Sequence, residues 1–98
     1  MRRNIPVCLS RAHWLDRDPS VCATDRDEAL DPTIETSERA AINSTENATY
    51  IDLSSSFCDE RICRAEVDGA PIFRDSHHIT ADFSRTLAGP LQAALKAL

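Results

Sequence analysis

The sequence is poor in glycine and in aromatic residues, and it has no long apolar run. Glycine occurs only at positions 69 and 89, and aromatic residues make up 5% of the 98 residues. The core must therefore rest on aliphatic side chains, and a chain of this length suits one domain with a modest core. No stretch approaches the roughly 20 apolar residues that span a bilayer, and no apolar signal-peptide segment follows Met1. We therefore expect neither a transmembrane helix nor an export signal in this chain.

Basic residues are outnumbered as well. Lysine and arginine total 11 against 16 aspartates and glutamates, which gives a net charge of -5. Binding of nucleic acid needs a concentrated basic surface, because the phosphates dominate the affinity. The pair Arg2 and Arg3 is too small a cluster to supply one. The composition therefore argues against a nucleic-acid partner.

Cysteine, in contrast, is plentiful: the chain has four, an even number that favours disulfides and an oxidising compartment. Three pairings are open, and we favour the sequential one, Cys8 with Cys22 and Cys58 with Cys63, because each bridge then closes a local loop. A zinc site is less well supported, because Cys58 and Cys63 have no second close pair of ligands. Disulfides indicate export, but we find no export signal in this chain. Both observations are explained if the chain is the C-terminal part of a longer protein.

The first half of the sequence predicts one helix between two strands. Alternating apolar residues predict a short strand over residues 4–10, although a proline weakens it. Charged residues and prolines predict an irregular loop over residues 11–32. Good helix formers predict a helix over about residues 33–46. The β-forming residues of segment 48–54 predict the strongest strand of the chain.

The second half predicts a hairpin followed by a helix. The dipeptide Asp68-Gly69 favours a tight turn between β-like runs at 65–67 and 72–74. Thr80 is a suitable N-cap for the last helix, which Gly89-Pro90 should kink or break. That helix carries an apolar stripe, which we assign to the core: Phe83, Leu87, Leu91, Leu95 and Leu98. The order of elements fits part of a layered α/β fold.

The segment whose side chains are best suited to catalysis or metal binding is "RDSHHIT", residues 74–80. Asp75 stands three residues before His78, a spacing that lets an acid orient an imidazole as a general base for a serine. The spacing alone is equally typical of a solvated loop before a helix. A metal site formed by Asp75, His77, His78 and Asp82 is also conceivable, but adjacent histidines in a loop are expected to point in different directions.

The context of this loop carries a family resemblance. The tract from Tyr50 to Leu87 resembles the C-terminal section of SGNH (GDSL-type) hydrolase domains, especially those fused to membrane-bound acyltransferases that O-acylate cell-surface glycans. The similar features, in order, are a strand ending in an acid ("IDL"), a loop bounded by two cysteines, the hairpin "DGAPIFR", and "DSHHIT" before the last helix. The upstream segments "IPVCLSRAH" and "VCATDRDEAL" also look like that family, so the resemblance covers nearly the whole chain.

The resemblance implies a fold and a site. It implies that residues 1–98 form a single partial domain, the C-terminal half of an α/β, three-layer, flavodoxin-like SGNH fold. It makes His78 the general base and Asp75 its orienting acid, while His77 falls on a variable position of the motif. It implies no cofactor and no metal.

It also implies a reaction and its partners. The reaction would be acyl transfer to or from a sugar hydroxyl of a cell-surface glycan through a serine ester. The partners would be the missing N-terminal half of the SGNH domain and a membrane-embedded acyltransferase domain. The domain would lie outside the cytoplasm, at the cell surface or in the periplasm, attached to the membrane through its parent protein.

The chain departs from the family in one respect. The family's nucleophile lies in a Gly-Asp-Ser block and its oxyanion donors in further blocks, and none of the serines here follows Gly-Asp. An acid and a base without a nucleophile or an oxyanion hole give little rate enhancement, so we expect the chain alone to be inactive. The alternative is a disulfide-stapled extracytoplasmic binding module in which Asp75 and His78 are structural.

Overall fold

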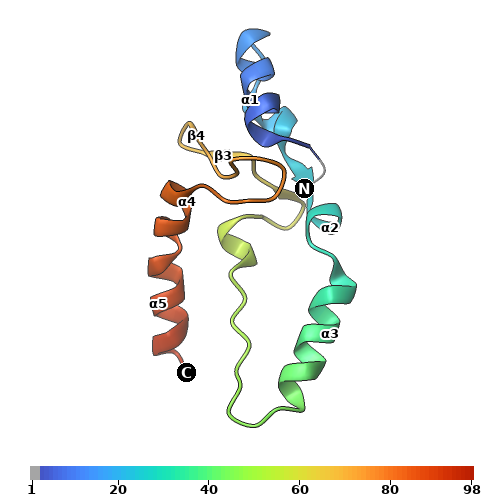
Figure 1. Ribbon diagram of the computed structural model, residues 1–98, viewed down its shortest axis with the longest axis vertical. Helices are drawn as coiled ribbons and strands as arrows, with labels where there is room; N and C mark the ends of the chain where they lie inside the picture. The colour runs from blue at the N-terminus through green and yellow to red at the C-terminus, as the bar shows by residue number, and fades with distance from the viewer. Residues whose placement is uncertain (1–2) are drawn as a thin grey trace.

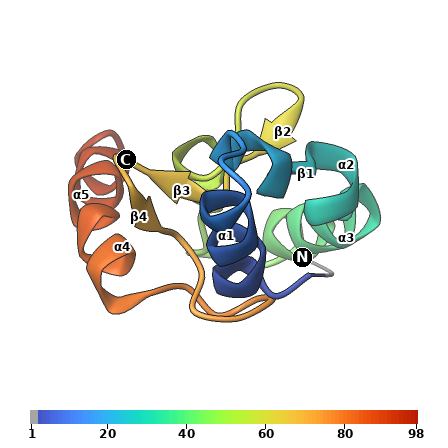
Figure 2. The same cartoon turned by 90° about the horizontal axis from the view of Figure 1, so that it is seen from above.

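The computed structural model describes residues 3–98, so Arg2 of the small basic pair lies outside the described residues. The chain forms a small body from which two helices, α3 (Pro32–Asn43) and α5 (Ala88–Lys96), project in the same direction, with an extended segment between them (Figure 1). The molecule measures 52 × 27 × 21 Å. Seen from above, α1 (Ile5–Trp14) lies in the middle, between α5 and α3 (Figure 2).

The strand predicted over residues 4–10 is wrong, because this segment begins α1. The Asn4 side chain accepts a hydrogen bond from the Val7 amide at 3.1 Å and so caps the helix. Pro6 lies in the first turn, where its missing N–H costs no helical bond. Ile5 and Ala12, two helical turns apart, face the core. The buried residues of this segment therefore follow the period of a helix and not the alternation of a strand.

The irregular loop predicted over residues 11–32 is also wrong. After α1 the chain forms the short helix η1 (Pro19–Cys22), the strand β1 (Thr24–Asp25) and one turn of helix, α2 (Arg26–Ala29). The Asp18 carboxylate starts η1 by accepting from the Ser20 amide at 2.8 Å. Asp18 caps η1 and Pro19 stands in its first turn, so these residues start a short helix instead of leaving the chain irregular.

The helix predicted over residues 33–46 is confirmed as α3, which ends at Asn43, and the Asp31 carboxylate caps it by accepting from the Thr33 amide at 2.9 Å. The strand predicted over residues 48–54 is wrong: most of that segment is extended, but it pairs with no strand of the described chain and ends in the short helix η2 (Ser54–Ser56). A β-strand needs a neighbour for its hydrogen bonds, and within residues 3–98 no such neighbour is present.

The four strands form two antiparallel pairs. β1 pairs with β2 (Ile62–Cys63), and β3 (Glu66–Val67) pairs with β4 (Ala70–Pro71). The predicted turn is confirmed, because Asp68 and Gly69 have φ values of 51° and 80°, as a type I′ turn requires. The second strand of the hairpin lies at 70–71 rather than at the predicted 72–74. This mixture of helices and small sheets is consistent with an α/β class, but residues 3–98 contain no sheet of more than two strands and no three-layer arrangement.

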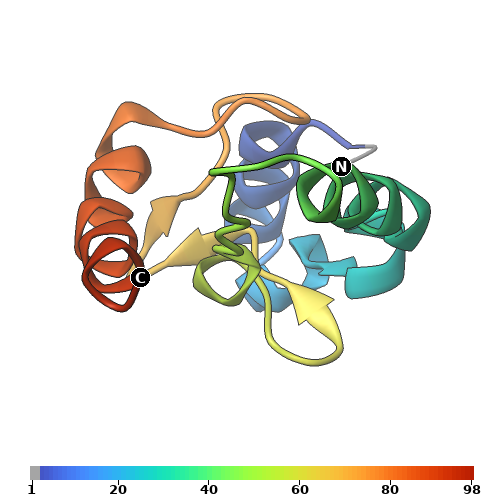
Figure 3. The same ribbon diagram turned by 90° about the horizontal axis from the view of Figure 1, so that it is seen from below.

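The last two helices are α4 (Ala81–Thr86) and α5, separated at Leu87. The Thr80 cap and the break near Gly89-Pro90 are confirmed, and Thr80 Oγ1 accepts from the Phe83 amide at 3.2 Å. The assignment of the whole apolar stripe to the core is wrong. Only Phe83 is buried, while the leucines along α5 are exposed, because α5 stands clear of α3 (Figures 1 and 3).

The core lies in the body of the molecule. A cluster of buried side chains joins α1 to η1 and to the β3 region, and its members are Ile5, Ala12, Cys22 and Ala65. Phe57 extends the packing to Phe83, with ring centroids 5.0 Å apart. No residue in 25–57 or 84–98 is buried. None of the helices formed by residues 3–98 has the length and the apolar character needed to cross a membrane.

Candidate active site

The candidate site is a loop closed at its base by backbone hydrogen bonds. Phe73 and Ile79 form an antiparallel bridge, and the Arg74 amide donates to the His78 carbonyl at 2.8 Å. Thr80 adds a further bond from its amide to the Ile72 carbonyl, also at 2.8 Å. The chain from Asp75 to His77 is therefore held at the tip of a narrow loop just before α4.

The Asp75 carboxylate organises the tip of this loop. One oxygen, Oδ1, accepts from the His77 amide at 2.9 Å and from the His78 amide at 2.7 Å. The other, Oδ2, lies 2.7 Å from Nδ1 of the His78 ring. These bonds favour the ionised form, so the pKa of Asp75 lies well below its ordinary value, first because of the two backbone amides and then because of the His78 side chain.

His78 is oriented as a general base must be. Because an ionised carboxylate can only accept, the proton on the neutral imidazole must lie on Nδ1, which leaves the lone pair on Nε2. Among residues 3–98, no group hydrogen-bonds to Nε2, and the His78 side chain is 53% exposed. An open Nε2 opposite a carboxylate-bound Nδ1 is the arrangement that activates a serine hydroxyl.

His77 is more exposed than its neighbour, at 67% of its side chain, and its Nδ1 lies 2.9 Å from Ser76 Oγ. The expectation that the two imidazoles point apart is wrong, because their ring centroids lie only 4.2 Å apart. The Asx-type turn made by Asp75 brings both rings to the same side of the loop.

This proximity gathers three of the four residues considered as metal ligands. One ligand atom from each of Asp75, His77 and His78 lies within 4.8 Å of the others, whereas Asp82 is not part of the group and pairs with Arg85 at 2.6 Å. Both oxygens of Asp75 already accept hydrogen bonds. A metal ion bound through His78 Nδ1 would replace the bond that orients His78.

The N-terminal region is hydrogen-bonded to the loop. The Ile5 amide, at the start of α1, donates to the Asp75 carbonyl at 3.3 Å. α1 is in turn fixed to η1 by the disulfide Cys8–Cys22, and a second disulfide joins Cys58 to Cys63. This is the sequential pairing that we favoured. The role of Asn4 in placing Ile5 was missed in the sequence, although an asparagine two residues before a proline is a typical helix start.

The structure does not bring a serine to the base. No serine hydroxyl of residues 3–98 hydrogen-bonds to His78, and the nearest in sequence, Ser76, bonds to His77 instead. The loop thus holds a carboxylate bonded to the His78 imidazole, and within residues 3–98 no serine is bonded to that imidazole.

Comparison with known protein families identifies the family of the chain. The family model of the SGNH domain, described as fused to AT3 domains, matches residues 1–93. The chain belongs to the SGNH domain family. No curated protein and no solved structure matches the chain. Membership of the SGNH family relates the chain to acyltransferase family 3 and makes it a hydrolase-like module of the kind associated with acyltransferases.

Proposed function

We propose that this chain is the C-terminal part of an SGNH domain that transfers acyl groups to or from the sugar hydroxyls of cell-surface glycans. Residues 1–98 would form a single partial domain that contributes Asp75 and His78. The serine and the oxyanion donors would come from a preceding Gly-Asp-Ser segment. The observation that carries the proposal is the bond between Asp75 Oδ2 and His78 Nδ1 at 2.7 Å, which leaves Nε2 open.

The proposed reaction follows from this geometry. Nε2 of His78 takes the proton from the serine hydroxyl while the serine oxygen attacks the acyl carbonyl carbon. The same proton then passes to the departing alcohol oxygen, and the acyl group stays on the serine as an ester. A second hydroxyl, from a sugar or from water, reverses these steps and regenerates the serine. Asp75 stabilises the imidazolium that forms in both halves of the reaction.

The exposed apolar surfaces support the proposal of a partial domain. Ile34 on α3 is 58% exposed, and Leu91 and Leu95 on α5 are 40% and 52% exposed. Between these helices runs an extended segment with β-forming residues and no strand beside it (Figure 3). A strand from a preceding segment would pair with residues 48–53 and would cover these helices, which would complete the three-layer, flavodoxin-like sheet.

The disulfides and the family support the proposed location. Two disulfides are stable in an oxidising environment, which fits the cell surface or the periplasm. The fusion of related SGNH domains to AT3 domains supports a membrane-embedded acyltransferase domain as the physical partner.

The test is to look for the nucleophile. The DNA upstream of this chain, or a partner gene, should encode a Gly-Asp-Ser segment, and that segment should react with a fluorophosphonate only when residues 1–98 are also present. A catalytic serine labelled at the same rate without residues 1–98 would contradict the proposal, and so would the absence of any encoded Gly-Asp-Ser segment.

A further inference from the structure

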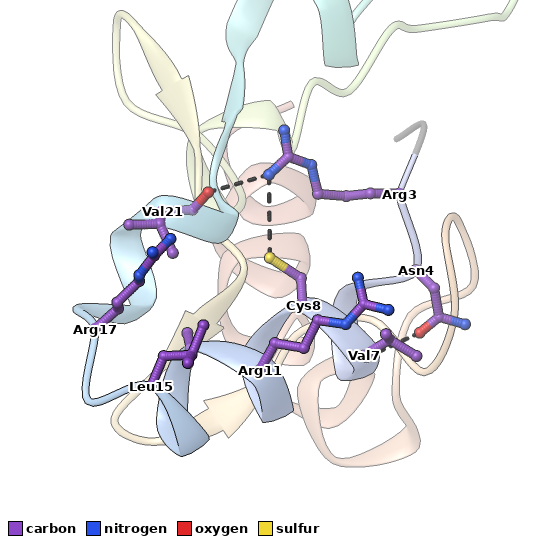
Figure 4. A pocket seen from close by; sticks show the side chains of 9 residues that line it. Arg3, Asn4, Val7, Cys8, Arg11, Leu15, Arg17 and Val21 are labelled. Atoms are coloured by element: carbon purple, nitrogen blue, oxygen red, sulfur yellow. Dashed lines mark hydrogen bonds between the residues drawn. The ribbon is translucent and has the colours of Figure 1, made fainter.

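A basic hollow lies along α1, on the side away from the core. It encloses about 460 Å³, within the range of small-ligand sites. Three guanidinium groups line it: Arg3 from the segment before α1, Arg11 from α1, and Arg17 from the turn that follows (Figure 4). In a chain with a net charge of -5, this is a local concentration of positive charge.

The positive charge of this hollow is not neutralised by the protein. No acidic residue lines it. The arginines that form ion pairs within residues 3–98 lie elsewhere, at positions 39 and 85. Arg3 Nη1 donates to the Val21 carbonyl at 3.1 Å and to Cys8 Sγ at 4.0 Å, and these two contacts fix its position (Figure 4). A guanidinium has five N–H donors, so most remain available to an anion.

Exposed apolar side chains also line the hollow, together with Asn4, Cys8 and the buried Ala12. Val7, Leu15 and Val21, at 45%, 55% and 48% exposure, lie between the arginines. Trp14 is 86% exposed and lies one helical turn beyond Arg11, so it is not a packing anchor. A ligand that matches this lining has an anionic group for the arginines and an apolar face for the aliphatic side chains. An acidic sugar has both, because a carboxylate or phosphate adjoins the C–H face of a pyranose ring.

The hollow adjoins the candidate active site. It extends to Asn4, and the next residue, Ile5, bonds through its amide to the Asp75 carbonyl. The disulfide Cys8–Cys22 fixes its two sides relative to each other. A polymer held in the hollow would therefore lie beside the loop that carries the general base.

We propose that this hollow binds the anionic sugars of the acceptor glycan, so that the substrate is an acidic polysaccharide. The inference rests on the proposed function for its placement next to the reaction, although binding itself requires no catalysis. Bidentate pairs between guanidinium and carboxylate or phosphate would fix the polymer, and Leu15 with the two valines would receive the sugar faces.

The test is an NMR titration of the 98-residue chain, with its disulfides intact, against three probes: an oligogalacturonate, a sugar phosphate and a neutral oligogalactan of equal length. We expect the amides of α1 and η1 to shift with an acidic probe and not with the neutral one. Arg11→Gln and Arg17→Gln should each weaken binding about fivefold to tenfold, and added salt should weaken it too.

The control is Arg61→Gln, which removes the same charge from an acid-lined hollow elsewhere and should leave binding unchanged. The response to uronate or to phosphate identifies which anion the site prefers.

Equal shifts with neutral and acidic sugars, or an equal effect of Arg61→Gln, would overturn the proposal. Binding of inorganic phosphate alone, or of anionic lipid vesicles with no response to any saccharide, would overturn it as well. Failure here would leave the serine reaction of the proposed function standing, because that reaction is tested through His78. Failure of the serine reaction would likewise leave saccharide binding measurable.

Discussion

Asp75 connects local structure to chemistry in a single side chain. Its Oδ1 atom shapes the loop through two backbone amides, and its Oδ2 atom sets the orientation of His78. The two functions are separable, because an asparagine side chain still has one oxygen that can accept from the backbone, whereas its nitrogen can only donate.

Asp75→Asn is therefore expected to preserve the loop and change the tautomer of His78. With a donor facing Nδ1, the ring proton should move to Nε2, which removes the lone pair a general base needs. The ¹⁵N shifts of the His78 ring measure this directly, and Asp82→Asn, at an acid outside the site, is the matched control. Retention of the Nδ1 proton in Asp75→Asn would contradict the geometry.

The lowered pKa of Asp75 predicts a pH dependence with a definite sign. The folded pKa of Asp75 lies below its ordinary value of 3.8, so the native state binds fewer protons than the unfolded state in this range. The stabilising contribution of Asp75 is present in full above its unfolded pKa and is lost as the pH falls through the lower folded pKa. The ¹³C shift of the Asp75 carboxyl should titrate with a midpoint below 3.8. A midpoint at or above that value would show that the backbone bonds do not form.

At the scale of the elements, turns, helix caps and helix breaks could be predicted from the sequence. The Asp68-Gly69 turn, the Thr80 cap and the break near Pro90 were all predictable, since each depends on a few adjacent residues. α1 was missed because the apolar residues at 5, 7 and 9 alternate as in a strand and the capping role of Asn4 was not recognised. The strand at 48–54 was missed for a different reason: strand formation depends on a neighbour that local sequence cannot supply.

The glycines of the β3–β4 turn and of α5 offer a matched pair of substitutions. Gly69 has a φ of 80°, and an added Cβ would meet nothing within 4 Å, so Gly69→Ala should cost only the backbone strain, about 1 kcal/mol. Gly89 lies in α5, also with open space at its Cβ position, so Gly89→Ala should raise the free energy of unfolding by a few tenths to about 1 kcal/mol. Urea unfolding of both variants checks the sign. Equal effects would show that Gly69 does not need the left-handed conformation.

At the scale of the whole molecule, the chain is more extended than a closed domain. Its radius of gyration is 15.4 Å, against about 13 Å expected for a compact domain of this length. The core is confined to the body, while α3 and α5 present apolar residues to solvent. The predicted pairing of Asp75 with His78 is present, because it depends on three adjacent peptide units. The predicted layers are not formed by residues 3–98, because they would depend on a second half of the sheet.

This difference in scale predicts how the leucines of α5 respond to substitution. In the 98-residue chain, Leu91→Gln and Leu95→Gln should change the free energy of unfolding by less than about 0.5 kcal/mol, because both side chains are exposed. In a domain completed by its preceding segment, the same substitutions should cost about 2 kcal/mol or more. Chemical denaturation of both forms makes the comparison. Equal, small effects in the two forms would mean that no preceding segment covers α5.

The central claim is that His78, and not its neighbour, is the base of a serine acyltransferase or esterase. The most direct measurement is the rate of ester hydrolysis by the completed domain carrying either His78→Ala or His77→Ala, two exposed imidazoles whose rings lie 4.2 Å apart. We predict that His78→Ala lowers kcat by about 10²–10⁴-fold, while His77→Ala changes it by less than about threefold. Equal losses in the two variants, or full activity without the His78 imidazole, would contradict the account.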